Sequence, residues 1–195
     1  MFNMKVFDFK TTNKILEEAS KKSAQTPERT IYVFAGPNGS GKSTLIANLY
    51  LEGKLKVEYI NADVYCNTFF KDVQDEELRN KAAMFFTTDK VKQYISEGKS
   101  FCYETVLSHP SKIELLQEAK NHGYKIVSTF VYTTNPEINV ERVASRAKQG
   151  GHDVPKEKIV SRYSRSLELG KKLSEISDCF SKFDNSKNQS IQFEK

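Results

Sequence analysis

Short apolar runs alternate with longer segments of helical periodicity along most of the chain. The runs are rich in β-branched and aromatic residues, as buried parallel strands are, and they cover residues 30–35, 57–60, 101–105, 125–132 and 179–183. Between them, apolar side chains recur every three or four residues, which predicts helices over residues 44–51, 75–97, 113–122, 136–148 and 155–173. This alternation predicts a three-layer α/β fold with a mainly parallel, five-stranded sheet and right-handed crossovers.

Both ends of the chain depart from this alternation. Residues 1–28 combine a short stretch of helical spacing with a polar, proline-containing segment, so we expect an N-terminal extension and linker there and the main domain over residues 29–195. The extension either packs on the edge of the sheet or serves as a regulatory or partner-binding arm. At the other end, residues 191–193 form another apolar run beyond a turn-rich segment, and we expect them to pair with residues 179–183.

The composition is that of an ordinary globular domain, with 38% hydrophobic and 28% charged residues among 195. The 30 basic and 25 acidic side chains leave a net charge of +5 without a dense basic run, so nucleic acid is not the favoured partner. No stretch reaches the ~18–20 apolar residues that span a bilayer, and the N-terminus lacks the apolar core of a signal peptide. We therefore expect a cytoplasmic protein with no membrane partner.

The most informative segment is GPNGSGKST at residues 36–44, which matches G-x-x-x-x-G-K-[ST] between a predicted strand and a predicted helix. Its glycines allow successive backbone N–H groups to face a phosphate, and the following helix adds its positive N-terminal end. Lys42 is expected to neutralise the β- and γ-phosphates, and the Ser43 hydroxyl to ligate Mg²⁺. The segment is therefore a P-loop, and it predicts ATP and Mg²⁺ as cofactors. The expected nucleotide-binding residues in it are Gly36, Pro37, Asn38, Gly39, Ser40, Gly41, Lys42, Ser43 and Thr44.

A P-loop alone does not separate kinases, GTPases and transport ATPases, but other signals narrow the class. The chain has no N-K-x-D guanine signature, no apolar strand ending in D-E and no LSGGQ motif. Its modest size and the basic segment late in the chain favour kinases of small molecules or nucleotides.

Two carboxylates are predicted at the carboxyl ends of strands, where a parallel sheet places its reactive groups. Asp63 follows the second predicted strand, and Glu104 closes the third. An aspartate within reach of an acceptor hydroxyl would act as the general base. A second carboxylate could hold other substrate hydroxyls or a metal-bound water. For both residues, position alone leaves open a purely structural role such as helix capping.

A basic tract late in the chain is the third candidate element. Arg142 and Arg146 share one helical face, and Arg162 and Arg165 share another, with the segment GGHDVP between the two helices. Because a glycine hinge allows closure and guanidinium groups bind phosphate in two places at once, we expect a lid over residues 142–166. The alternative is a pair of solvated basic helices joined by a loop.

The motifs together resemble those of the zeta-toxin family of P-loop kinases, especially its short stand-alone members. The resemblance rests on residues 36–44 (GPNGSGKST), 61–63 (NAD), 103–108 (YETVLS), 142–167 and 183–186. It implies a P-loop kinase core. It also implies an ATP- and Mg²⁺-dependent activity on the 3′-hydroxyl of UDP-N-acetylglucosamine or a related nucleotide sugar, and an antitoxin protein as partner.

Carried over by motif, the resemblance also implies roles for single residues. Asp63 would deprotonate the sugar hydroxyl. The expected substrate contacts are Asn61, Glu104 and Thr105. The arginines near GGHDVP would grip the γ-phosphate, with Arg146 and Arg162 catalytic, like Lys42, and Arg142 on the nucleotide.

Two other functions remain open from the sequence. The chain could be a nucleotide-binding switch without turnover, in which case Asp63→Asn should hardly change its function. It could also phosphorylate a nucleic-acid end, and its affinity for that acceptor should then fall steeply with salt.

Overall fold

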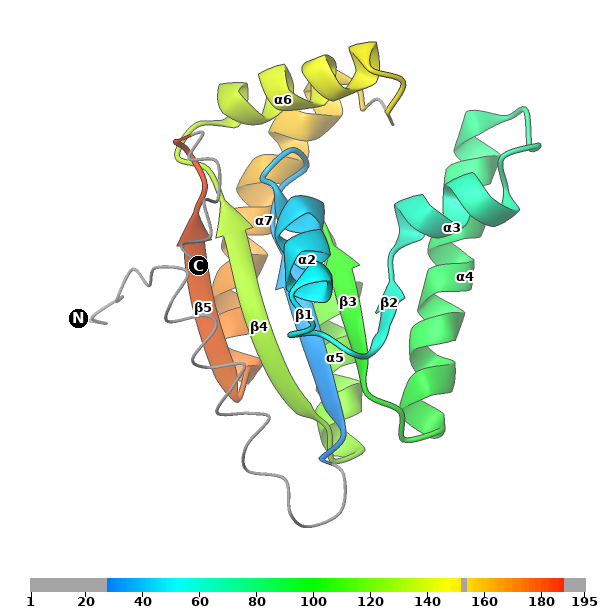
Figure 1. Cartoon of the computed structure of the whole chain (residues 1–195), viewed down its shortest axis with the longest axis vertical. Helices are drawn as coiled ribbons and strands as arrows, with labels where there is room; N and C mark the ends of the chain where they lie inside the picture. The colour runs from blue at the N-terminus through cyan, green and yellow to red at the C-terminus, as the bar shows by residue number, and fades with distance from the viewer. Residues whose placement is uncertain (1–27, 152–153, 188–195) are drawn as a thin grey trace.

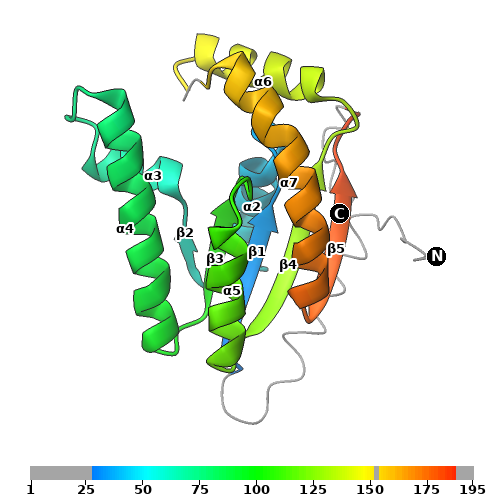
Figure 2. The same cartoon turned by 180° about the vertical axis from the view of Figure 1, so that it is seen from behind.

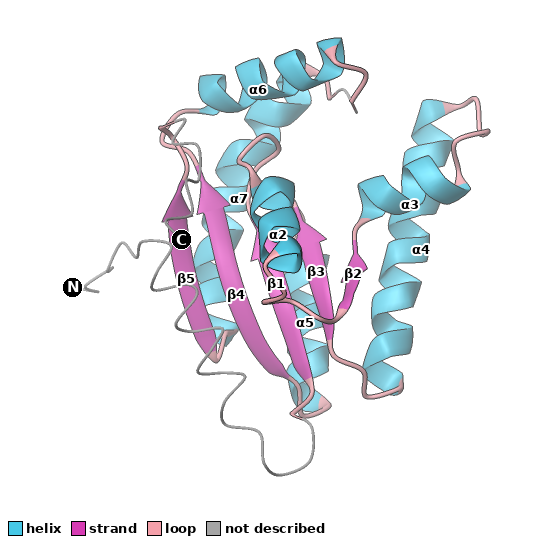
Figure 3. Ribbon diagram, viewed as in Figure 1, coloured by secondary structure: helices cyan, strands magenta, loops and turns pink. Residues whose placement is uncertain are grey.

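The computed structural model describes residues 28–151 and 154–187. Within this part, helices and strands alternate as the periodicity predicts (Figure 3). In chain order they are β1 (Thr30–Ala35), α2 (Lys42–Leu51), β2 (Glu58–Ile60), α3 (Ala62–Phe69), α4 (Glu76–Ser96), β3 (Phe101–Thr105), α5 (Ser111–Asn121), β4 (Lys125–Tyr132), α6 (Pro136–Lys148), α7 (Lys156–Ile176) and β5 (Cys179–Asp184). Residues 1–27 and 191–193 lie outside the described part, so the expected extension and the expected pairing of residues 191–193 stay predictions.

The strands form one five-stranded sheet in the order β2-β3-β1-β4-β5, and every neighbouring pair is parallel. β1 lies at the centre, with its last residue Ala35 opposite Thr105 in β3 and Phe130 in β4. Figure 1 shows that the strands end at the same edge, where the loops after β1, β2 and β3 gather. The α/β prediction is confirmed, and the sheet is wholly rather than mainly parallel.

The alternation of side chains along the strands divides the core into two layers. Ile31, Val33 and Ala35 of β1 face the layer formed by α4, α5 and α7 (Figure 2). Phe34, which lies between Val33 and Ala35, faces the opposite side and packs with Leu45 and Leu49 of α2. The sheet is therefore covered on both faces, which is why its strands read as continuous apolar runs.

α3 is the one described helix that the hydrophobic pattern did not predict. Most of its sequence, ADVYCNTF, consists of residues with weak helix propensity, so neither its length of 8 residues nor its composition indicated a helix. Asn61 starts it as an N-cap, with its side chain accepting from the backbone N–H of Asp63 at 2.6 Å. Its buried residues Tyr65 and Cys66 fix it against neighbouring structure. Tertiary contacts and a cap therefore stabilise this helix in place of propensity.

The two helices of the predicted lid region lie next to each other. α6 lies across the carboxyl edge of the sheet, and α7 returns along the face opposite α2 (Figures 1 and 2). Val143, Val154 and Ile159 form a small apolar core between them. The two helices therefore share their own core, apart from the two larger ones. No helix in residues 28–151 and 154–187 is long and apolar enough to cross a membrane.

Candidate active site

The loop after β1 is a tightly packed backbone turn. Gly36 has φ +145°, and a Cβ placed there would lie 1.9 Å from the carbonyl oxygen of Val131. Gly39 has φ +72°, and its Cβ would lie 2.6 Å from the carbonyl oxygen of Asn139. These two positions require glycine both for conformation and for space. The loop leads into the N-terminus of α2, which is the arrangement that binds phosphate.

Two asparagines from distant parts of the chain hold the loop in place. Asn139 of α6 is fully buried; its Nδ2 donates to the carbonyl oxygen of Asn38. Asn185, directly after β5, donates from Nδ2 to the carbonyl oxygen of Ser40 at 2.8 Å. Sequence reasoning gave neither asparagine a role, although the resemblance tract included Asn185. In the sequence, Asn185 is a polar residue just after a strand, and Asn139 is a polar residue inside an amphipathic helix. Both patterns are too common to indicate a functional residue.

Lys42 lies buried inside the same loop. Its Nζ donates to the carbonyl oxygen of Pro37 at 2.9 Å. Burial lowers the pKa of Lys42, while the charges of Glu104 and Asp63 act in the opposite direction. A buried ammonium is costly unless it is paired, so this position favours a bound anion. The prediction that Lys42 faces phosphate groups fits this environment.

The polar groups of the loop also suit a bound nucleotide. Among the described residues, Asn38 Oδ1 and Ser40 Oγ are buried without a hydrogen-bond partner. Buried polar atoms are normally satisfied, so these two atoms suit a ligand with donors and acceptors of its own. Ser43, at the second position of α2, is exposed, as a hydroxyl ligand of a phosphate-bound Mg²⁺ should be. Thr44 is exposed beside it. The residues present therefore fit ATP and Mg²⁺.

Glu104 connects this loop to the second strand. Its Oε1 accepts from the Ser43 hydroxyl at 2.9 Å, and its Oε2 accepts from the Tyr59 hydroxyl. Both oxygens of a buried carboxylate are thus engaged, one of them by the predicted magnesium ligand. Thr105, the next residue, accepts from the backbone N–H of Leu107 at 3.1 Å, while its carbonyl accepts from Gly36 at 3.3 Å. In this structure Thr105 shapes the loops that surround the site.

Asp63 lies exposed in the first turn of α3, where the Asn61 cap places it. Asp63 is one of the residues around a cavity of about 420 Å³ beside the P-loop. The described residues that line it are Ser43, Ile46, Ala47, Tyr50, Tyr59, Asn61, Asp63, Val64, Asn67 and Arg146. The structure therefore brings the predicted metal ligand, the candidate base and one predicted arginine around one space. Sequence reasoning missed its apolar wall, because those residues read as ordinary helix and strand positions.

The arginines of the basic tract are placed differently from one another. Arg146 of α6 lines the cavity, whereas Arg142 lies half-buried one turn earlier in the same helix. Arg162 of α7 is not among the described residues that line it. Arg165 donates from Nε to the carbonyl oxygen of Ser161 at 3.1 Å, a contact within its own helix. Of these arginines, the described site includes only Arg146 directly, and His152 lies outside the described residues.

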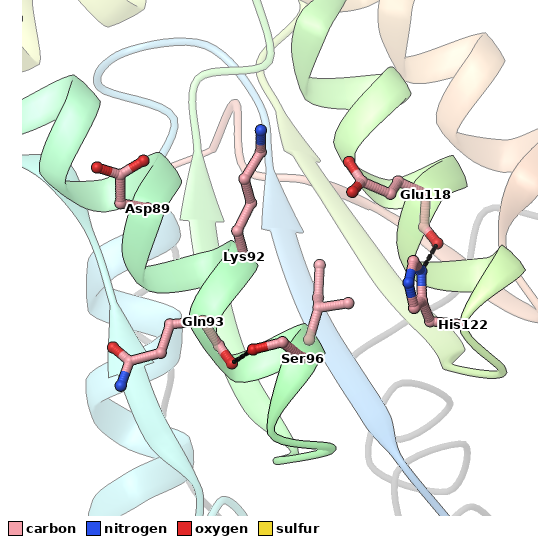
Figure 4. Close-up of a pocket in the computed structure, with 7 residues that line it drawn as sticks. Asp89, Lys92, Gln93, Ser96, Glu118 and His122 are labelled. Carbon is pink, nitrogen blue, oxygen red and sulfur yellow. Dashed lines mark hydrogen bonds between the residues drawn. The ribbon is translucent and has the colours of Figure 1, made fainter.

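A second cavity, of about 450 Å³, lies between α4 and α5 (Figure 4). Two of the polar side chains drawn there bond to nearby backbone: Ser96 donates to the carbonyl of Gln93 at 2.7 Å, and His122 contacts the carbonyl of Glu118 at 2.9 Å. Among the described residues, its lining contains none of those predicted from the sequence. The candidate active site is therefore the cavity beside the P-loop.

The chain also matches a known protein family. The family model described as zeta toxin matches residues 13–183, a span that holds the P-loop, both carboxylates and the arginines. The chain belongs to the zeta toxin family. The family is one of P-loop kinase-like proteins, so the predicted resemblance is confirmed at that level.

The individual proteins that resemble this chain have low sequence identity to it. An uncharacterized protein of Haemophilus influenzae is 28% identical over 130 residues, which cover 67% of this chain and 89% of that protein. The structure of the PezAT toxin–antitoxin system of Streptococcus pneumoniae has a TM-score of 0.62 at 16% identity, covering 90% of this chain and 75% of that chain. The AvrRxo1-ORF1:-ORF2 complex with ATP has a TM-score of 0.58 at 18% identity, covering 85% and 58%. At such identities the structures show a common zeta-toxin-like fold.

Proposed function

We propose that this zeta toxin family member is a kinase that transfers the γ-phosphoryl group of ATP to the hydroxyl of a small molecule. The observation that carries the proposal is the cavity shared by Ser43, Asp63 and Arg146 beside the P-loop. The favoured acceptor is the 3′-hydroxyl of UDP-N-acetylglucosamine or a related nucleotide sugar, which follows from the family resemblance. The toxin–antitoxin system with the same fold supports an antitoxin protein as partner.

On the nucleotide side, the chain supplies positive charge and oriented donors. The backbone of the P-loop and Lys42 hold the β- and γ-phosphates, and Arg146 approaches from α6. Ser43 and, through it, Glu104 would hold Mg²⁺, which neutralises charge on the phosphates when bound. Arg142 and Arg162 enter this proposal as further phosphate ligands that the lid helices carry.

On the acceptor side, Asp63 is the general base. Its carboxylate takes the proton of the acceptor hydroxyl as that oxygen forms a bond to the γ-phosphorus. The bond from the γ-phosphorus to the bridging oxygen breaks, and ADP leaves with both electrons. Asn61 borders the acceptor and caps the helix that carries Asp63. Glu104 accepts from Ser43, and Thr105 supports the loop behind them.

The deciding experiment measures ATP turnover with and without UDP-N-acetylglucosamine, with the product weighed by mass spectrometry. Asp63→Asn should lower kcat by about 10²–10⁴-fold and leave the dissociation constant of ATP within about twofold, because a general base contributes to that extent. Asp89→Asn is the matched control, since Asp89 is an aspartate of the other cavity. A sugar nucleotide heavier by one phosphate, from wild type and control only, is the expected result.

Other outcomes separate the alternatives. Binding of ATP without phosphorylation of any hydroxyl acceptor would contradict the kinase and favour the nucleotide-binding switch. Phosphorylation of an RNA or DNA end, with an affinity that falls steeply as salt rises, would replace the small-molecule acceptor with a nucleic acid. Equal activity of Asp63→Asn and wild type would remove Asp63 from the role of base.

A further inference from the structure

Tyr59 lies on the short edge strand β2, one residue before its end. The sheet register pairs it with Cys102 of β3. Because side chains alternate along a strand, Tyr59, Cys102 and Glu104 share one face of the sheet, the face covered by α2. The tyrosine ring therefore reaches along this face toward the carboxylate that bonds the P-loop serine.

The Tyr59 hydroxyl makes two hydrogen bonds of opposite direction. It donates to Glu104 Oε2, and it accepts from Asn61 Nδ2 at 2.8 Å. Burial, and then the neighbouring Glu104 charge, raise the pKa of Tyr59 far above its usual value. The hydroxyl therefore joins the Glu104 carboxylate to the Asn61 amide.

The two partners of this hydroxyl each hold one half of the candidate site. Glu104 accepts from the Ser43 hydroxyl at 2.9 Å through its other oxygen. Asn61 uses its carbonyl oxygen to cap α3, accepting from the backbone N–H of Asp63 at 2.6 Å. The result is a continuous chain of hydrogen bonds from Ser43, through Glu104, Tyr59 and Asn61, to the backbone of Asp63.

We propose that the Tyr59 hydroxyl is a positioning group that fixes the separation of the magnesium ligand Ser43 and the base Asp63. This inference rests on the proposed kinase function and adds a residue to it. Phosphoryl transfer depends on that separation, because a shift of about 1 Å in a reacting group can cost 100-fold in rate. In this role Tyr59 acts through Glu104 and Asn61, and its hydroxyl need not touch the transferred group.

The ring of Tyr59 has a separate packing role, and the tested variant must preserve that packing. It lines the cavity and packs edge-on against Tyr50 with ring centroids 6.3 Å apart. Tyr59→Phe preserves this packing and removes only the hydroxyl. Tyr94→Phe is the matched control, because it also removes a tyrosine hydroxyl that donates to a glutamate. The Tyr94 hydroxyl donates to the carboxylate of Glu58 at 2.5 Å. Glu58 is the neighbour of Tyr59 in β2, and neither Tyr94 nor Glu58 is among the described residues that line the cavity.

We expect Tyr59→Phe to lower kcat by about 10- to 100-fold with a much smaller change in the KM for ATP, while Tyr94→Phe keeps the wild-type kcat. Glu104→Gln combined with Tyr59→Phe should be hardly slower than Glu104→Gln alone, because both substitutions break the same chain. Equal kcat for Tyr59→Phe and Tyr94→Phe, or multiplicative losses in the double variant, would overturn the proposal.

A binding measurement keeps this test separate from that of the kinase itself. We expect the Mg²⁺ concentration that gives half-maximal binding of a fluorescent ATP analogue to rise severalfold in Tyr59→Phe and to stay unchanged in Tyr94→Phe. If wild type binds ATP but phosphorylates nothing, the proposed function fails, and this titration alone decides the role of Tyr59. If Tyr59→Phe does not fold, Asn61→Ser is the substitute, because serine still caps α3 but lacks the Nδ2 group that donates to Tyr59.

Discussion

The nucleotide side and the acceptor side of the site are built in different ways. On the nucleotide side, backbone packs on backbone: Gly36 lies against the carbonyl of Val131, and Gly39 against that of Asn139, with the amides of Asn139 and Asn185 as added support. On the acceptor side, side chains do the positioning, through the hydroxyl of Tyr59 and the amide of Asn61. The first arrangement tolerates almost no substitution, whereas the second depends on a few polar atoms.

The two sides also differ in how deeply they are embedded in the fold. The P-loop follows the central strand β1, which has neighbours on both sides. α3 follows the edge strand β2, which has three residues, and it packs on the first half of α4. Phe69 of α3 and Phe85 of α4 are 60% and 72% exposed. The candidate site therefore combines one half at the centre of the sheet with another half at its edge. Three substitutions test this, from the largest expected effect to the smallest.

Gly36→Ala should be the most disruptive change on the nucleotide side. Its Cβ would lie 1.9 Å from a carbonyl oxygen at a φ that L-residues avoid, so we expect a loss of roughly 3–5 kcal/mol in the free energy of unfolding and no ATP binding. Urea denaturation and a fluorescent ATP analogue measure both. Gly123→Ala is the control: Gly123 has φ +79° but open space around its Cβ, so its loss should stay near the ~1–2 kcal/mol of backbone strain. Equal losses in the two variants would refute the argument from packing.

Asn139→Ala tests the side-chain support of the same loop. It leaves the carbonyl of Asn38 without its partner and removes one of the two acceptors of the Thr133 hydroxyl, and we expect a cost of about 2–4 kcal/mol together with weaker ATP binding. Asn135→Ala in the same segment removes only the cap of α6, so it should cost about 1 kcal/mol and leave ATP affinity unchanged. If Asn139→Ala loses stability but keeps its ATP affinity, the contact from α6 to the P-loop does not contribute to ATP binding.

Phe85→Gln should have the smallest effect of the three. Phe85 is exposed on α4 and lies outside both cavities, so the free energy of unfolding should change by no more than about 0.5 kcal/mol. Thermal melting beside Tyr65→Ala, a buried ring of α3 that should cost several times more, checks the contrast. A large loss in Phe85→Gln would show that the acceptor side is packed as tightly as the nucleotide side.

The strands and the P-loop could be predicted from the sequence because each is a local pattern. β1, β3 and β4 are found at the residues expected, and the glycines of the P-loop read directly as a phosphate cradle. Local patterns could not show α3, whose stability comes from the Asn61 cap and from tertiary packing. Nor could they show that Asn185 reaches the P-loop, because that contact joins residues 145 positions apart.

In the candidate site, too, local motifs could be predicted from the sequence and tertiary contacts could not. Lys42, Ser43, Asp63 and Arg146 were predicted from motifs and lie together in the structure around the P-loop and its cavity. The role of Tyr59 depends on which face of β2 carries it and on the register with β3, and neither is visible in the three residues of that strand. The places of Arg142 and Arg162 relative to the γ-phosphate stay predictions.

The wide sequence spacing of the P-loop's supports has a consequence for synthesis on the ribosome. The motif is complete at residue 44, but its supports at Val131, Asn139 and Asn185 are translated later. At about 5–20 residues per second, the last of them follows the motif by roughly 7–28 s. A nascent chain that already carries every P-loop residue therefore still lacks the groups that shape the loop. The loop therefore gains its full set of described supports only after residue 185 has been translated.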